Sequence, residues 1–235
     1  MTARSIHWFW YASPQTFYPL AGSIARACGA AAALLAVAGL YIGLVAAPTD
    51  AQQGEAYRII FIHVAAAWMS MFLYVVMAFW AALGLAFNTR LSGMMASALA
   101  PTGALFTFIA LWTGSLWGRP TWGTYWVWDA RLTSELILLF LYFGFMALQA
   151  AIDDPRRADR AGAVLALVGV VNIPIIYFSV QWWNTLHQGA SVSLKRAPTM
   201  AATMFTGMIL MALAFWMYSV AVALVRVRCI IRERG

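Results

Sequence analysis

Residues 59–87 read IIFIHVAAAWMSMFLYVVMAFWAALGLAF, and this stretch decides the fold class of the chain. It contains no Asp, Glu, Lys or Arg, and His63 is its single histidine. About 20 consecutive apolar residues allow a helix to cross the roughly 30 Å hydrocarbon core of a bilayer. The stretch therefore predicts a membrane-spanning helix that carries one imidazole.

Five more stretches have the same character. The six predicted spans cover residues 24–47, 59–87, 94–117, 132–152, 162–180 and 200–225. The chain is 63% hydrophobic and 10% charged, with a mean hydropathy of +0.77, whereas a soluble fold carries about 25% charged residues. We therefore predict an all-α integral membrane protein, with residues 1–235 forming one domain, a six-transmembrane-helix bundle surrounded by lipid. This composition excludes a cytosolic enzyme, a disordered chain and a typical nucleic-acid-binding domain.

The basic residues predict the orientation, because Lys and Arg gather in cytoplasmic loops. With both termini cytoplasmic, ten basic residues lie inside and five outside. The inner set is Arg4, Arg26, Arg90, Arg156, Arg157, Arg160, Arg226, Arg228, Arg232 and Arg234; the outer set is Arg58, Arg119, Arg131, Lys195 and Arg196. The first residues lack the pattern of a removable signal peptide. We expect His7, Trp8, Trp10 and Tyr11 to form an interfacial collar.

Rare residues gather on the outer side of this predicted topology. His63 lies near the outer end of the second span, and His187 lies in the last outer loop, residues 181–199. Six tryptophans belong to the same side: Trp117, Trp122, Trp126 and Trp128 in the loop at 117–131, and Trp182 and Trp183 at the start of the next outer loop. Aromatic belts enrich Trp at both membrane interfaces, so a belt alone does not predict this asymmetry.

Two outward histidines suit the axial positions of a haem. An ionisable group inside a membrane span is by default a functional candidate, although a histidine hydrogen-bonded between packed helices remains an alternative for His63. Two imidazoles with no carboxylate or thiolate do not form a closed zinc site. The aromatic faces and forked cations that a porphyrin and its propionates need are available from Trp122, Trp126, Trp128, Arg58 and Arg131.

Other polar and breaking residues have structural interpretations. Asp129 is placed to cap the fourth span, and Glu135 stands four residues after Arg131, the spacing of an ion pair along one helix face. Pro174, with Asn172 beside it, predicts a bend in the fifth span, as Pro101 does in the third. Gly39 and Gly43 form a GxxxG pattern, which is weak evidence for a partner helix.

The chain lacks the short motifs of several enzyme classes. There is no Walker loop, GxSxG or HExxH, and Cys28 and Cys229 form neither CxxC nor CxxCH. We therefore expect no independent enzymatic activity. Two alternatives to haem handling remain. One is a haem-containing subunit for electron transfer or quinol oxidation, and the other is a solute transporter, which usually has broken spans meeting near the midplane.

The run WGTYWVWDARLT, residues 122–133, closely resembles the tryptophan-rich WWD signature of haem-handling proteins in cytochrome c maturation. Six spans and one histidine on each side of the motif resemble, within that group, the haem exporter protein C (CcmC) family. The resemblance implies that His63 and His187 ligate the iron of haem b. It implies that Trp122, Trp126, Trp128 and Asp129 form the haem platform in a periplasmic WWD loop, with Arg58 and Arg131 placed for the propionates. Tyr125 stands where many relatives have a second Trp.

The same resemblance implies a function, partners and a location. It implies presentation of haem at the periplasmic face and its delivery to the haem chaperone CcmE, for the biogenesis of c-type cytochromes. The implied partners are CcmE, the small one-span protein CcmD, and the ABC transporter subunits CcmA and CcmB. The implied location is the inner membrane of a bacterial-type cell, with the functional face periplasmic.

Overall fold

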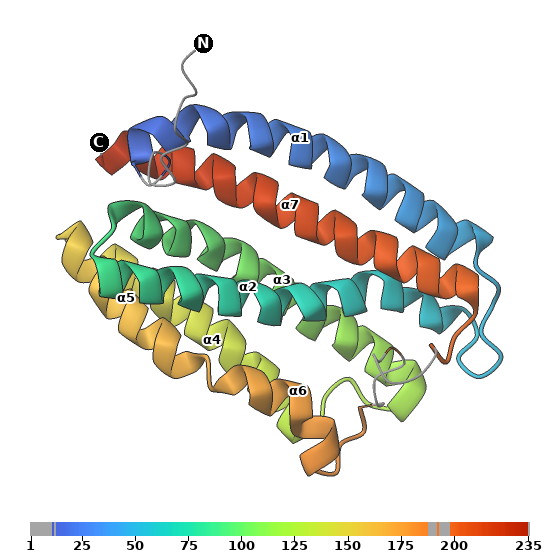
Figure 1. Cartoon of the computed structure of the whole chain (residues 1–235). Helices are drawn as coiled ribbons and strands as arrows, with labels where there is room; N and C mark the ends of the chain where they lie inside the picture. The colour runs from blue at the N-terminus through green and yellow to red at the C-terminus, as the bar shows by residue number, and fades with distance from the viewer. Residues whose placement is uncertain (1–10, 12, 188–191, 193–197, 235) are drawn as a thin grey trace.

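The computed structural model describes residues 11, 13–187, 192 and 198–234, and this part of the chain consists of helices joined by loops, with no strand (Figure 1). The helices are α1 (Pro14–Tyr41), the π-helical turn η2 (Ile42–Ala46), the 3-10 turn η3 (Glu55–Ile59), α2 (Ile60–Phe87), α3 (Arg90–Trp122), α4 (Ala130–Ala151), α5 (Pro155–Gly169), α6 (Asn172–Trp182) and α7 (Ala202–Arg234). His7, Trp8 and Trp10 of the predicted collar lie outside the described residues.

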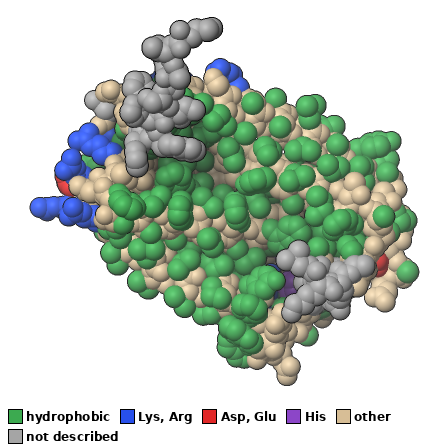
Figure 2. All heavy atoms as spheres, in the orientation of Figure 1, with side chains coloured by type: hydrophobic (Ala, Val, Ile, Leu, Met, Phe, Trp, Pro, Cys, Tyr) green, Lys and Arg blue, Asp and Glu red, His purple; other side chains and the backbone are tan. Residues whose placement is uncertain are grey.

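Within the part of the chain that the structure describes, six segments are long and apolar enough to cross a membrane, which confirms the predicted helical bundle. They run Pro14–Ala46, Glu55–Phe87, Arg90–Trp122, Ala130–Ala151, Pro155–Trp182 and Ala202–Arg234. The start of α1 and the end of α7 lie at the same end of the bundle (Figure 1). Hydrophobic side chains cover most of the face seen in Figure 2, while basic side chains gather at the end that holds the start of α1 and the end of α7. The orientation of this end toward the cytoplasm stays a prediction.

The glycines of the GxxxG pattern pack within the chain. A Cβ on Gly39 would lie 3.0 Å from the Met211 side chain on α7, and one on Gly43 would lie 2.6 Å from the ring of Phe61 on α2. Gly207 on α7 faces the backbone of Gly43 in return. The close approach that the pattern predicted is therefore made between α1, α7 and α2, and it does not require a helix from another protein.

The fifth span is interrupted where Pro174 predicted a bend. Proline has no N–H to donate to the carbonyl four residues before it, and its ring crowds that carbonyl, here the one of Val170. The chain leaves α5 after Gly169 and enters α6 at Asn172. Asn172 then donates from Nδ2 to the carbonyl of Ser134 at 2.9 Å, which fixes the break against α4. Pro101, by contrast, lies inside a continuous α3.

The tryptophan-rich loop is shorter than predicted, because α3 continues through Pro120 to Trp122. Gly123 ends the helix with a φ of 79°, and its N–H donates to the carbonyl of Arg119 at 3.1 Å. Trp117 and Trp122 are thus helical residues, and the loop begins at Gly123. Asp129 caps the next helix as predicted, accepting from the Leu132 N–H at 2.8 Å. At the other outer loop, α6 includes Trp182.

Candidate functional site

A pocket with about 670 Å³ of empty space, part of it open to the surroundings, lies between the first turns of α2, the last turns of α3 and the first turns of α4. In Figure 1 these helix ends lie opposite the start of α1 and the end of α7. His63 and His187 both line this pocket, and we call it the histidine pocket. Trp122 and Arg131 also line it, so the structure brings together four of the residues that the sequence singled out.

His63 is held in the wall of this pocket by α3. It is 9% exposed, and its Nδ1 lies 3.1 Å from the hydroxyl oxygen of Thr113. That hydroxyl donates to the carbonyl of Ile109 at 2.6 Å, so its oxygen accepts from an Nδ1–H of His63. A neutral imidazole with its proton on Nδ1 keeps the lone pair of Nε2 for a ligand. This is the arrangement that usually orients metal-binding histidines.

Gly114 gives the imidazole room beside α3. A Cβ at Gly114 would lie 2.9 Å from Cε1 of His63, closer than real Cβ atoms approach. On the other flank, the ring centre of Trp117 is 5.6 Å from that of His63, with the two planes at 72°. The Nε1 of Trp117 donates to Gln53 at 2.8 Å, so the indole is itself fixed. His63 therefore has a defined place between a glycine and an aromatic wall.

His187 faces His63 across the pocket. Their ring centres are 6.4 Å apart, and the ring planes are tilted by 35°. A ligating imidazole nitrogen lies about 2 Å from its metal and about 1 Å from its own ring centre, so a metal between two imidazoles separates the ring centres by about 6 Å. The observed separation matches this requirement.

Trp122 completes the outer wall beside His187. The ring centres of these two residues lie 6.1 Å apart. Gly118, one turn earlier on α3, lets the indole lie back over the helix, because a Cβ there would be 3.1 Å from Trp122 Cε3. The extension of α3 beyond Pro120 thus positions Trp122 from a helix rather than from a loop.

Arg131 and Glu135 both line the pocket, but the predicted ion pair between them is not among the contacts of the described residues. Arg131 donates from Nη1 to the carbonyl of Ile176 on α6 at 2.8 Å. Glu135 is 6% exposed and accepts from the Ser70 hydroxyl at 2.7 Å, while its Oε2 is buried with no hydrogen-bond partner among the described residues. The two side chains lie one turn apart on α4, as predicted, but each forms its hydrogen bond with a residue of another helix, Arg131 with α6 and Glu135 with α2.

Sequence reasoning treated Glu135 as structural and did not select Thr113 or Gly114. A signal existed for Glu135, because a carboxylate inside an apolar span is a functional candidate. No comparable signal marks Thr113 or Gly114, since hydroxyl and glycine residues are common in membrane helices and only the packing of α3 against α2 brings these two to His63.

Four predicted site residues lie outside the residues that line the pocket. Trp126 and Trp128 contact each other in the loop, with ring centres 5.4 Å apart, and Trp128 is 76% exposed. Asp129 caps α4, as described above. Arg58 pairs with Glu55 and donates to the carbonyl of Gly43 at 2.7 Å, which ties the start of α2 to the end of α1.

The residues of the histidine pocket fit a flat, apolar, metal-centred ligand with carboxylates. The described residues contain no group of three or more His, Cys, Asp or Glu that could hold a bare metal ion. Two opposed imidazoles leave the remaining coordination positions to the ligand itself, as a porphyrin provides. Indoles, leucines and alanines supply apolar walls, and Arg131 supplies a cation that a carboxylate can meet.

Comparison with known proteins agrees with this donor set. The family model described as "Heme exporter protein C" matches residues 7–235. A relative named Heme exporter protein C from Bradyrhizobium diazoefficiens is 50% identical over 218 residues, 92% of this chain and 82% of the relative. The protein of the same name from Escherichia coli K12 is 52% identical over 180 residues, 77% and 74% of the two chains. A "Putative cytochrome c biosynthesis ccmC-like mitochondrial protein" from Marchantia polymorpha is 49% identical over 154 residues, 66% and 65% of the two chains.

Proposed function

This chain belongs to the Heme exporter protein C family and is a multi-pass membrane protein of haem export for cytochrome c maturation, and on that premise we propose that it holds haem b between His63 and His187. In this proposal the chain presents the haem at the periplasmic face and delivers it to the haem chaperone CcmE. The observation that carries the proposal is the 6.4 Å separation of the two imidazole rings across one pocket.

The two histidines are held in the protein in different ways, and this difference suggests from which side of the pocket the haem leaves. His63 lies on α2 and is fixed by Thr113 and Trp117 from α3. His187 follows the end of α6, in the connection to α7, and its ring contact with Trp122 lies on the outer side of the pocket. We infer that His63 keeps the iron centred until His187 is replaced, so that the cargo leaves from the outer side.

The polar residues of the pocket have separate roles in this scheme. Arg131 meets a propionate, while Trp117 and Trp122 exclude water from the two imidazoles. The WWD residues Trp126, Trp128 and Asp129 form the outer surface next to the pocket, where we place the contact with the chaperone. Arg58 acts through the α1–α2 connection, and its proposed propionate contact requires Glu55 to release it.

The member proteins of the Ccm exporter system are the proposed partners. Beside CcmE, these are the one-span CcmD and the ABC transporter subunits CcmA and CcmB, which would supply the ATP chemistry for which this chain has no motif. The proposed location is the bacterial-type inner membrane with both termini cytoplasmic, which agrees with the gathering of arginines at the end where α1 starts and α7 ends (Figure 2).

Removing the two ligands tests the proposal. We expect His63→Ala/His187→Ala protein to lose the low-spin bis-imidazole absorption of the purified wild type, with haem content down by roughly tenfold or more, because both axial bonds are lost. His7→Ala, which changes the third histidine, should keep both. Gel filtration and circular dichroism would show that each variant is folded. Unchanged haem content and spectrum in the folded double variant would sink the ligand assignment.

Electron transfer is the alternative that the same experiment leaves open, since a quinol-linked subunit also holds haem between histidines. The purified protein would be mixed with a reduced quinol under anaerobic conditions, and haem reduction followed by absorbance. We expect no reduction on the timescale of haem transfer to the purified chaperone. Rapid quinol-dependent reduction that requires His63 would favour the alternative.

A further inference from the structure

A second cavity lies at the end of the bundle where α1 starts and α7 ends. It has about 520 Å³ of empty space and lies between α2, α3, α4 and α5. Three arginines line it: Arg90 at the start of α3, and Arg156 and Arg160 on the first turns of α5. We call it the arginine pocket. No sequence motif of haem handling includes it, and no residue is shared with the histidine pocket.

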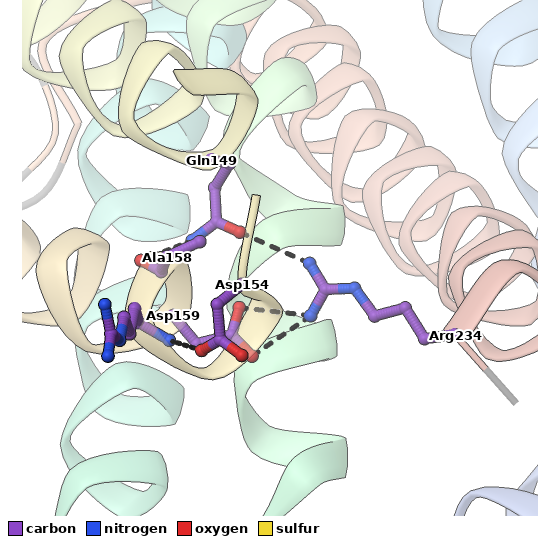
Figure 3. Close-up of polar contacts among 6 residues, drawn as sticks. Gln149, Asp154, Ala158, Asp159 and Arg234 are labelled. Carbon is purple, nitrogen blue, oxygen red and sulfur yellow. Dashed lines mark hydrogen bonds and ion pairs between the residues drawn. The ribbon is translucent and has the colours of Figure 1, made fainter. Parts of the chain in front are cut away.

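The one carboxylate among the lining residues is already paired. Arg234, near the end of α7, donates from Nη1 to both oxygens of Asp159, at 3.1 and 3.0 Å. Gln149 on α4 braces this pair, because its Oε1 accepts from Arg234 at 3.3 Å and its Nε2 donates to the carbonyl of Ala158 at 3.0 Å (Figure 3). Asp159 therefore does not neutralise the arginines of the pocket.

The three lining arginines are available to a ligand. All three are exposed, and none forms an ion pair with a described residue. Two helices also begin at this pocket, and the first N–H groups of a helix attract anions. On α5 the side chain of Asp154 already accepts from the Arg157 N–H at 2.8 Å. On α3 the hydroxyl of Thr89 donates to Ser92, so no side chain caps the helix start.

The interior of the arginine pocket is apolar. Ala81, Phe145 and Ala163 are buried in its wall, and Leu85 lies half-exposed at its edge. Gly93 lets α5 come close, since a Cβ there would lie 2.7 Å from Cγ of Asp159. A ligand for this site therefore needs an anionic head for the arginines and an apolar part for the space between the helices.

We propose that the arginine pocket binds an anionic phospholipid, with the phosphate between Arg90, Arg156 and Arg160 and the start of an acyl chain against Leu85 and Phe145. The location supports a lipid, because the pocket opens at the end of membrane-length helices, where headgroups lie. Basic pockets between transmembrane helices are known to bind phosphorylated headgroups. The proposal does not depend on how haem is bound at the other end.

Native mass spectrometry of the detergent-purified full chain with added phosphatidylglycerol tests this site. Each arginine near a headgroup contributes about 5-fold in affinity, so Arg156→Gln/Arg160→Gln should weaken phosphatidylglycerol binding by roughly 30-fold. Arg26→Gln/Arg157→Gln removes the same charge at the same end without touching a lining residue, and should change affinity by less than about twofold. Arg156→Lys/Arg160→Lys should retain most of the binding.

The competitors decide the chemistry of the ligand. Phosphatidylcholine and inorganic phosphate should not displace phosphatidylglycerol, because the first lacks net charge and the second lacks the apolar part. Displacement of phosphatidylglycerol by inorganic phosphate at similar concentration would show that the site binds a simple anion and not a lipid. Displacement by haem would assign the site to porphyrin carboxylates. An equal loss of phosphatidylglycerol affinity in both glutamine double variants would show that only the general surface charge matters. Each of these results would overturn the proposal.

Discussion

The histidine pocket and the arginine pocket lie at opposite ends of the same helices, yet they use different chemistry. In the histidine pocket, the His63 imidazole is hydrogen-bonded to Thr113 and the Trp117 indole to Gln53. The arginine pocket is lined by permanent charges that reach the surface. A buried charge needs a partner, whereas an exposed guanidinium keeps its hydration. The difference shows that the two ends of one bundle suit different ligands, because imidazoles suit a metal centre and guanidinium groups suit an anion.

The hydrogen bond from His63 to Thr113 is where this difference is tested most sharply. We expect Thr113→Val to weaken haem retention by about 10- to 100-fold, because the buried imidazole loses the acceptor that sets its tautomer. Thr107→Val is the matched control, since Thr107 is also buried on α3 and donates to a backbone carbonyl, that of Gly103. Haem titration of both purified variants measures the difference. Equal haem retention in the two variants would mean that haem binding in the histidine pocket does not depend on the hydrogen bond between His63 and Thr113.

Among the described residues that line the histidine pocket, Arg131 is the one fixed cation, so its removal is the next largest effect. We expect Arg131→Ala to lower haem affinity by about tenfold, the value of a charge-assisted hydrogen bond. Arg228→Ala, which removes an arginine stacked on Tyr18 with its guanidinium 4.3 Å from the ring centre, should leave haem affinity unchanged. Titration with haem and with a haem ester that lacks free carboxylates would separate the charge from the packing. The same loss with both ligands would contradict a propionate contact.

The two kinds of tryptophan in the WWD region give a smaller contrast. Trp122 contacts His187 inside the histidine pocket, whereas Trp128 is exposed. An aromatic contact contributes about 0.5–1.5 kcal/mol beyond area burial, so Trp122→Ala should weaken haem retention several-fold. Trp128→Ala should affect delivery to the chaperone instead. Haem retention and the rate of haem transfer to the chaperone would be measured for both variants. The same change in both quantities for Trp122→Ala and Trp128→Ala would contradict separate roles for the two residues.

The smallest effect is expected at the ion pair beside the arginine pocket. Asp159→Asn should lower the stability of the detergent-solubilised protein by about 1 kcal/mol or less, because the pair with Arg234 is partly exposed. Its haem spectrum should be that of the wild type, since the histidine pocket shares no residue with this end. Thermal unfolding and absorbance spectra give both values. A changed spectrum would show that the two pockets are coupled.

Much of the fold was predictable because the membrane constrains the chain strongly. Apolar length predicted the six spans, Pro174 predicted the break between α5 and α6, and Asp129 predicted the start of α4. The predicted end of the third span at residue 117 was wrong, because α3 continues through Pro120 to Trp122. A proline removes one hydrogen bond, but Gly123 in the left-handed region is what ends this helix.

The site was predictable only in part, for a physical reason. His63 and His187 belong to a rare residue type and lie on the predicted outer side, so the sequence alone selected them, and the structure brings their rings together. Thr113, Gly114 and Ser70 act through contacts between helices that no local pattern records. Arg58 illustrates the reverse case, since a basic residue in the predicted place is engaged by Glu55 and the α1 end.

The glycine contacts between the first and last helices also have a consequence for biogenesis. Gly39 lies against Met211 and Gly43 faces Gly207, and both partners lie on α7. The helix that packs against α1 is therefore the last one to be synthesised. At roughly 5–20 residues per second, a ribosome needs on the order of ten seconds to pass from residue 46 to residue 202. During that interval the nascent α1 lies in the lipid or beside the insertion machinery, and Gly39 and Gly43 have no contact with α7. These contacts form only after α7 has been synthesised.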